Sequence, residues 1–250
     1  SSPSACNGAM VFSSDAYDNP DGGPCGGGGG ECPAAQTGEL ISPAIDLSTY
    51  DVVGVSLKFY QTMRQFQSSY IISYSNDDGA TWIDKEINEE VPVNSGTEGF
   101  KKVFLADADL SATNFRVKFR FEANYYYWIV DDVRIVETEA NNLQCAPNNF
   151  YAIAPNLMTP VSQVEPFSHL ADIYNAGAIE QTNINLNVSI VDDISSNVVF
   201  TDDLAYLPIP GDSLVENLPM PGYFTPDGSI PSSYTATYEI SSDSMDFDPT

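Results

Sequence analysis

The chain has 250 residues, of which 42% are hydrophobic and 12% aromatic, so it can bury a core and is not intrinsically disordered. Nine basic residues against 35 acidic residues give a net charge of −26, which excludes a surface that binds nucleic acid or anionic membranes. No apolar run is long enough to span a bilayer, so we expect no membrane insertion.

The positive charges are distributed unevenly along the chain. All nine Lys and Arg residues lie between Lys58 and Arg134. This length suits two domains, and the change in composition places their boundary near residue 145. We therefore expect one domain over residues 1–145 and a second over residues 146–250.

The four cysteines indicate an oxidising location outside the cell. They are Cys6, Cys25, Cys32 and Cys145. An even number in an acidic chain without an initiator Met favours disulfides and a secreted or cell-surface protein. Of the three possible pairings we favour Cys25–Cys32, which closes a short glycine-rich loop, with Cys6–Cys145, which ties the two ends of the first domain. The alternatives are free thiols or a zinc site, although the spacing of the cysteines does not suit zinc.

The hydrophobic pattern predicts strands and turns throughout. Residues 115–121 alternate strictly between apolar and basic side chains, as expected of a half-exposed strand in an antiparallel sheet. Residues 184–190 and 234–240 alternate in the second half, with proline-rich turns between them. The sequence therefore predicts an all-β protein of two sandwiches.

Basic side chains share one face of the predicted strand over residues 115–121. These are Arg116, Lys118 and Arg120. They form either a solvated face or a contact for an acidic ligand.

Residues 75–82 fit an Asp-box pattern, S-x-D-x-G-x-T-W. In such a hairpin Asp77 accepts backbone N–H bonds, Gly79 takes a positive φ, and Trp82 packs under the loop. The motif resembles the repeated structural boxes of sialidases. A single copy indicates an element of the fold and does not imply that activity.

The run from Tyr125 to Trp128 is the candidate ligand-binding surface, because exposed aromatic rings stack on sugars and on protein surfaces. In a strand, Tyr125 and Tyr127 share one face, and Tyr126 shares the other with Trp128. The alternative is core packing for one pair and an ordinary surface for the other.

Catalysis is disfavoured by the residues present. His169 is the one histidine of the sequence, and there is no G-x-S-x-G motif whose serine it could activate as a nucleophile. A glycosidase with paired carboxylates needs a deep cleft, which two small sandwiches rarely form. We therefore expect a protein that is not an enzyme.

The first domain resembles the MAM-type jelly rolls of meprin-like and receptor-phosphatase ectodomains, and related domains of gliding marine bacteria. The strongest matches are the L-I-S-P segment at 40–43 and the I-V-D-D-V-R-I segment at 129–135. The matching pieces, in chain order, are residues 40–43, 57–63, Trp82, 117–123, 129–135 and Cys145. This resemblance implies a two-sheet jelly roll, non-catalytic recognition or adhesion, and a structural calcium site where the last strand meets the amino-terminal segment.

Acidic residues fit the implied calcium site. Asp131 and Asp132 are adjacent on a predicted strand, so we expect their side chains on opposite faces, one of them facing inward. A buried carboxylate needs a cation or several hydrogen bonds. Asp15, Asp18 and Asp21 could supply further oxygen ligands. The alternative is an acidic turn and a hydrogen-bonded aspartate.

The second domain resembles immunoglobulin-like adhesion domains of the CARDB type. The matching pieces are residues 170–177 and 182–188, joined by an N-x-G turn. Such domains are common in large proteins that Bacteroidota export by the type IX pathway. We expect the last strand of this domain to be missing or supplied by another molecule, which would leave an open sheet edge for self-association.

These observations together predict an extracellular recognition or adhesion module, stabilised by calcium and part of a larger protein, with a protein or glycan ligand. The alternative is a carbohydrate-binding accessory module of a secreted hydrolase. An adhesion module should bind cells without glycan preference, whereas the accessory module should show an exposed aromatic platform.

Overall fold

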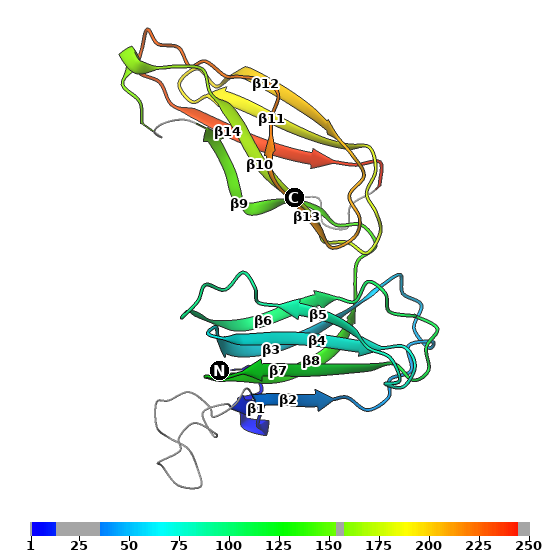
Figure 1. Cartoon of the computed structure of the whole chain (residues 1–250). Coiled ribbons are helices and arrows are strands. Elements are labelled where there is room, and N and C mark those ends of the chain that lie inside the picture. The colour runs from blue at the N-terminus through cyan, green and yellow to red at the C-terminus, as the bar shows by residue number, and fades with distance from the viewer. Residues whose placement is uncertain (1, 14–35, 154–157, 245–250) are drawn as a thin grey trace, which may run out of the picture. The chain divides into compact units, whose positions relative to one another are not determined.

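The protein is all-β, as the sequence predicts, and it divides into two compact units (Figure 1). The computed structural model describes residues 2–13, 36–153 and 158–244. The units are Ser1–Thr138 and Glu139–Thr250. Their boundary precedes the expected one near residue 145, because the strand that contains Cys145 pairs within the second unit.

None of the helices in the described part of the chain has the length and apolar composition needed to cross a membrane.

The first unit is a jelly roll of two four-stranded antiparallel sheets, preceded by a 3-10 turn, η1 (Ala5–Asn7). One sheet has, in spatial order, β1 (Met10–Ser13), β8 (Tyr127–Glu137), β3 (Val55–Arg64) and β6 (Gly96–Phe104). The other has β2 (Gln36–Ile41), β7 (Arg116–Ala123), β4 (Ser68–Ser75) and β5 (Ile83–Ile87). From β1 to β8 each successive strand changes sheet, except that β4 and β5 are neighbours in one sheet, and the two sheets share one core.

The core of the jelly roll is centred on Trp128, which is fully buried. Its ring lies 5.3 Å from that of Tyr70 and 5.6 Å from that of Phe119, measured between centroids. The indole Nε1–H donates to Oε1 of Gln61 at 3.1 Å, and the amides of Gln61 and Asn88 bond to each other. The large apolar ring therefore brings no unsatisfied donor into the core.

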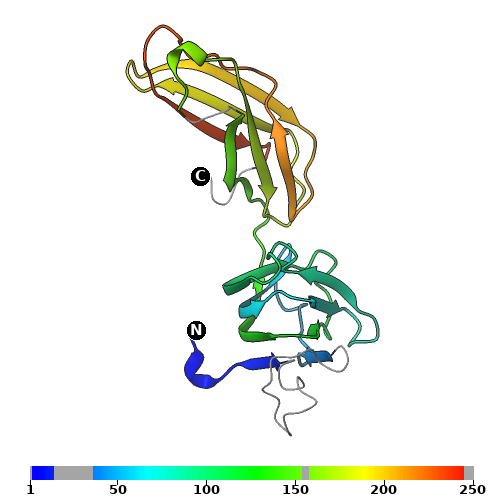
Figure 2. The ribbon, with the colours of Figure 1, turned by 60° about the vertical axis from the view of Figure 1, so that its left-hand side comes forward.

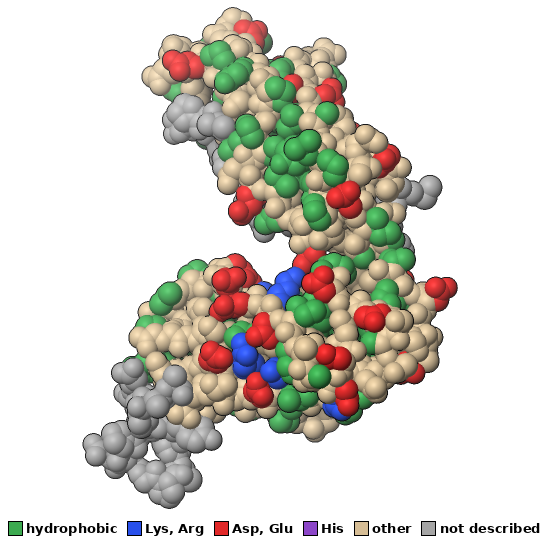
Figure 3. Space-filling model, turned by 45° about the vertical axis from the view of Figure 1, so that its right-hand side comes forward, with side chains coloured by type: hydrophobic (Ala, Val, Ile, Leu, Met, Phe, Trp, Pro, Cys, Tyr) green, Lys and Arg blue, Asp and Glu red, His purple; other side chains and the backbone are tan. Residues whose placement is uncertain are grey.

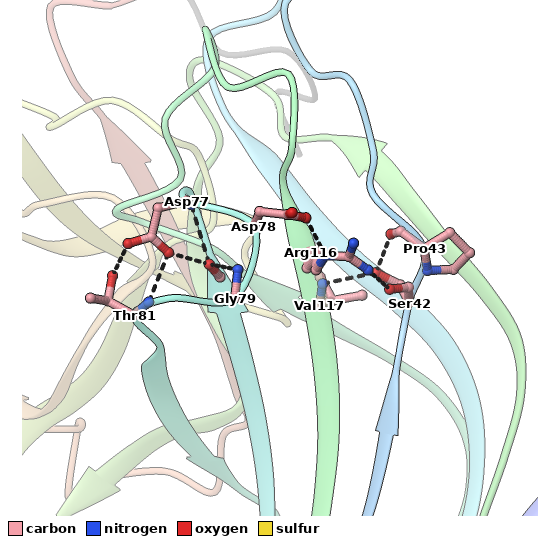
Figure 4. Close-up of polar contacts among 9 residues, drawn as sticks. Ser42, Pro43, Asp77, Asp78, Gly79, Thr81, Arg116 and Val117 are labelled. Atoms are coloured by element: carbon pink, nitrogen blue, oxygen red, sulfur yellow. Dashed lines mark hydrogen bonds and ion pairs between the residues drawn. The ribbon is translucent and has the colours of Figure 1, made fainter.

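The Asp-box residues form the turn between β4 and β5 (Figure 4). Asp77 accepts from the Thr81 backbone N–H at 2.8 Å and from the Thr81 hydroxyl at 2.6 Å, and these bonds lower the Asp77 pKa to about 2. Gly79 has a φ of 91°, as the motif requires. The box is an element of the fold, as predicted.

Replacement of this glycine should strain the jelly roll. A Cβ at Gly79 would lie 3.2 Å from Cζ2 of Trp82, on a backbone that L-residues rarely adopt. We expect Gly79→Ala to lower the free energy of unfolding by about 1–2 kcal/mol in chemical denaturation. Ala80→Ser, at an exposed position of the same turn, is the control and should have no comparable effect.

The second unit is an immunoglobulin-like sandwich of two three-stranded antiparallel sheets. One sheet has, in spatial order, β13 (Ser213–Pro219), β10 (Ser168–Asn175) and β9 (Leu143–Ile153). The other has β12 (Asn197–Tyr206), β11 (Ile184–Asp192) and β14 (Tyr234–Ser241), and a 3-10 turn, η3 (Val161–Gln163), precedes β10. Figure 2 shows the two sheets as separate layers.

The predicted alternation in β11 is confirmed, and it forms the centre of the second core. Ile184, Leu186, Val188 and Ile190 are buried, whereas the residues between them are partly exposed. Ala171 and Ile173 of β10 pack in the same core. An immunoglobulin constant-type domain has seven strands. The described residues of this unit form six strands.

His169 of β10 should titrate below the usual range for histidine. The side chain is 1% exposed, and burial lowers its pKa from 6.5, an effect that Asp202 partly offsets. The unfolded chain therefore takes up this proton at a higher pH than the folded chain does. The stability of the unit should be greatest above pH 6.5 and fall as the pH drops below that value, until the lowered pKa is reached.

The measurement is a titration of the imidazole resonances by nuclear magnetic resonance, which is unambiguous because His169 is the one histidine of the sequence. We expect a midpoint below pH 6.5. In the variant His169→Gln, the loss of stability that begins at pH 6.5 should disappear. A midpoint at or above 6.5 would show that the imidazole is solvated.

Candidate functional site

Aromatic rings gather where two turns meet at one end of the jelly roll. Phe66 lies in the turn between β3 and β4, and Tyr125 and Tyr126 lie in the turn between β7 and β8. The ring centroids of Phe66 and Tyr125 are 5.0 Å apart, and the guanidinium of Arg64 lies 4.8 Å from the centre of the Tyr126 ring. We call Arg64, Phe66, Tyr125 and Tyr126 the loop-end cluster.

The loop-end cluster is only partly buried, unlike the rings around Trp128. Phe66, Tyr125 and Tyr126 are partly exposed, and Arg64 is exposed. The rings are tilted rather than coplanar, with interplanar angles of 63° for Phe66–Tyr125 and 48° for Tyr125–Tyr126. The cluster therefore presents ring edges, ring faces and a cation to solvent.

The expected alternation from Tyr125 to Trp128 does not occur, because the strand begins only at Tyr127. Tyr126 has a φ of 63°, so the chain bends before β8 and brings Tyr126 beside Tyr125. Tyr127 pairs instead with Ser13 of β1. Burial, with a smaller contribution from the Tyr127 phenol, raises the pKa of Tyr70 to about 12.

Sequence reasoning missed Arg64 and Phe66 of this cluster, and it placed Tyr126 on the face opposite to Tyr125. The available signal was an aromatic residue, Phe66, between two glutamines at the tip of a hairpin, where an apolar ring has no core to enter. The cation–π contact of Arg64 with Tyr126 depends on the backbone at Tyr126, which no local pattern predicts.

The acid pair, Asp131 and Asp132, lies at a bulge in β8. The register of β3 with β8 shifts between Lys58 and Tyr60, and Asp132 has a φ of 50°. The expectation that the two carboxylates point to opposite faces is therefore wrong, because the bulge breaks the alternation. Both carboxylates contact the same amino-terminal segment, where Ser2 donates to Asp131 and Ser4 donates to Asp132.

The acid pair retains one unsatisfied oxygen. Oδ2 of Asp132 is buried and has no hydrogen-bond partner among the described residues. A buried carboxylate oxygen without a partner is costly unless a cation lies beside it, so the donor chemistry fits a hard cation. The described residues bring no third acidic, histidine or cysteine side chain to the pair. Asp15, Asp18 and Asp21, the other expected ligands, lie outside the described residues.

The predicted Cys6–Cys145 disulfide is not formed. Both thiols are free, Cys6 in the jelly roll and Cys145 in β9 of the second unit. The pairing assumed that Cys145 closes the first domain, whereas β9 pairs with β10. Burial raises the pKa of Cys145 to about 11, which keeps it a thiol. Cys25 and Cys32 lie outside the described residues.

The basic face of β7 is neutralised by acids from neighbouring segments. Lys118 is 7% exposed, and its ammonium also lies 4.5 Å from the centre of the Trp82 ring. The ion pairs are Arg116 with Asp78 at 2.6 Å, Lys118 with Glu39 at 3.0 Å and Arg120 with Asp84 at 2.9 Å (Figure 4 shows the first). The face is therefore neither a solvated row of cations nor an open site for an acidic ligand.

No family model matches the chain, and no curated protein matches it. Among solved structures it is similar to a protein described as a candidate beta-galactosidase from Bacteroides fragilis, with 10% identity and a TM-score of 0.29, covering 84% of this chain and 28% of that one. It is also similar to the glycoside hydrolase domain of Endo-D from Streptococcus pneumoniae R6, with 14% identity and a TM-score of 0.23, covering 92% of this chain and 35% of that one. The chain spans about a third of the length of these structures. Alignments this weak carry no information on activity.

Proposed function

We propose that the chain is a non-catalytic recognition or adhesion module of a secreted or cell-surface protein, and that the loop-end cluster contacts its partner. The observation that carries this proposal is the set of three partly exposed rings and an arginine, contributed by two adjacent turns. Tyrosine and arginine are enriched at the centres of protein interfaces, and tyrosine supplies a large contact area at low entropic cost.

One feature supports recognition rather than chemistry. Acids such as Asp77 and Asp109 are engaged in turns, where bonds from Thr81 and from Ser111, respectively, lower their pKa values. A general acid requires the opposite shift, towards neutral pH.

A carbohydrate-binding accessory module is the second candidate, because tyrosine rings also stack on sugars. A flat platform for sugar rings needs nearly coplanar aromatic faces, whereas Phe66 and Tyr126 are inclined at 71°. Arg64 also occupies one face of Tyr126. The geometry of the cluster therefore favours an irregular protein surface as the ligand.

We also propose that calcium stabilises the jelly roll at the acid pair. Asp131 and Asp132 tie the amino-terminal segment to β8, and Asp132 has a buried oxygen left over. A cation there would neutralise two adjacent carboxylates and fix the segment that precedes β1.

Calcium should raise the melting temperature of the chain. We expect an increase of about 5–10 °C when free Ca²⁺ exceeds its Kd a hundredfold, compared with excess chelator. Asp132→Asn should remove this response, whereas Asp109→Asn, in a turn of the same unit, should retain it. An unchanged melting curve of the native chain in calcium and in chelator would contradict the proposal.

Loss of a ring from the loop-end cluster should weaken adhesion. Beads coated with the chain are tested on a panel of bacterial and animal cells, and the soluble chain on a glycan array. We expect Tyr125→Ala to reduce bead adhesion about fivefold or more, since truncation of an interface tyrosine costs about 1–3 kcal/mol.

The matched control is Tyr50→Ala, because Tyr50 is 63% exposed in the connection between β2 and β3 of the same unit. Equal adhesion of both variants would contradict the assignment of the cluster. A glycan-array signal that Tyr125→Ala abolishes would establish the carbohydrate-binding alternative instead.

A further inference from the structure

The last strand of the immunoglobulin-like unit, β14, ends its sheet. It pairs with β11 on one side, and no described strand pairs with its other side. The strand contains no proline, and Glu239 is its one charged residue. Natural edge strands are usually protected by prolines, charges or bulges, and β14 has little of this protection.

The register shows which backbone groups of β14 face away from β11. Ser233 accepts a bond from the N–H of Asp193 at 2.9 Å, and Tyr234 lies opposite Asp192. In an antiparallel ladder, successive residues alternate between facing the partner strand and facing away from it. The N–H and C=O groups of Ala236 and Ile240 therefore point to the open edge.

An apolar cavity of about 710 Å³ lies on the inner side of this edge. Its lining includes Tyr234 and Ala236 of β14, Ala152 of β9 and the buried side chains of His169 and Phe224. Ala236 is exposed, although Tyr238 and Ile240 on the same face of β14 pack against the core. The cavity therefore opens beside Ala236, and β9 is a strand of the other sheet that comes near β14.

The negative charge of the immunoglobulin-like unit favours a positively charged partner. Residues 135–250 contain no Lys or Arg, whereas 14 acidic residues lie between Glu165 and Asp248. The visible face of the unit accordingly shows acidic and no basic side chains (Figure 3). Exposed Glu165 and Asp227 both line the cavity that adjoins β14.

We infer that β14 and the adjoining cavity bind an extended segment of another protein, in which apolar residues alternate with Lys or Arg. The segment adds a strand to β14 through main-chain hydrogen bonds and places one large apolar side chain in the cavity. Its cations alternate with the apolar residues, so they point to the opposite face, where Glu239 of β14 is exposed. A second copy of this chain is disfavoured, because pairing two such units brings together two acidic surfaces that have no cation.

The test uses a fluorescent ten-residue peptide that alternates valine and lysine and carries phenylalanine at a central apolar position. Binding to the full chain is followed by fluorescence anisotropy at low salt. We expect the change of phenylalanine to alanine to weaken binding tenfold or more, and glutamate in place of lysine to abolish it. Binding should also weaken as salt rises, and a scrambled peptide of the same composition should bind at least tenfold more weakly.

Two variants of one residue separate strand addition from simple charge attraction. Ala236→Pro removes a donor from the open edge and leaves the ladder to β11 intact, so it should abolish binding. Ala236→Ser keeps the donor and should bind like the native chain. Hydrogen exchange should show that the peptide protects the amides of Ala236 and Ile240, a readout that needs no variant.

Equal binding of the native and scrambled peptides, or undiminished binding by a folded Ala236→Pro variant, would overturn the inference. So would a dimer of the chain alone that Ala236→Pro dissolves, because the edge would then serve a second copy. Should Ala236→Pro fail to fold, the exchange measurement and the phenylalanine-to-alanine peptide decide the outcome.

Discussion

The jelly roll depends on the burial of one indole. Trp128 of β8 contacts the rings of Phe12, Phe59, Tyr70 and Phe119, which come from β1, β3, β4 and β7 and hence from both sheets. Its N–H reaches Gln61, so the ring can be fully buried without an unsatisfied donor. This fixes the register of β8: the turn with Tyr125 and Tyr126 must come immediately before it, and the bulge with the acid pair shortly after. The two proposed sites of the jelly roll therefore lie on either side of Trp128 in the sequence, and the burial of Trp128 positions both.

Much of the fold could be predicted from the sequence, because period-two patterns and turn chemistry are local. The burial of the apolar residues in 115–121 and 184–190 follows from alternation alone, and the Asp box follows from the spacing of Asp77, Gly79 and Thr81. The site geometry could not be predicted this way. Tyr126 and Asp132 adopt positive φ without being glycine, and each shifts its neighbours out of the alternation on which the sequence argument relied. The cause is tertiary, since the indole between them must face the core.

Long-range pairing was the second limit. Arg116 and Lys118 look like free cations in the sequence, and their acidic partners lie 38 or more residues away. Such pairs depend on the register of β7 with its neighbours, which a single sequence does not specify. The expected Cys6–Cys145 pairing was wrong for a related reason: Cys145 seemed to end the first domain, but β9 exchanges its hydrogen bonds with β10.

The two units differ in the physical interaction by which each can bind a partner. In the jelly roll the cations of β7 are already paired, and Lys58 lies over Phe100 as Arg64 lies over Tyr126, so its proposed contact depends on aromatic area. Such contacts depend little on ionic strength. The immunoglobulin-like unit has acids without any cation, and its attraction for a partner is consequently long-ranged and screened by salt. A protein that uses both surfaces would attract a basic segment by long-range charge, even when that segment is dilute. It would keep a second partner bound through aromatic contact area when the salt concentration rises.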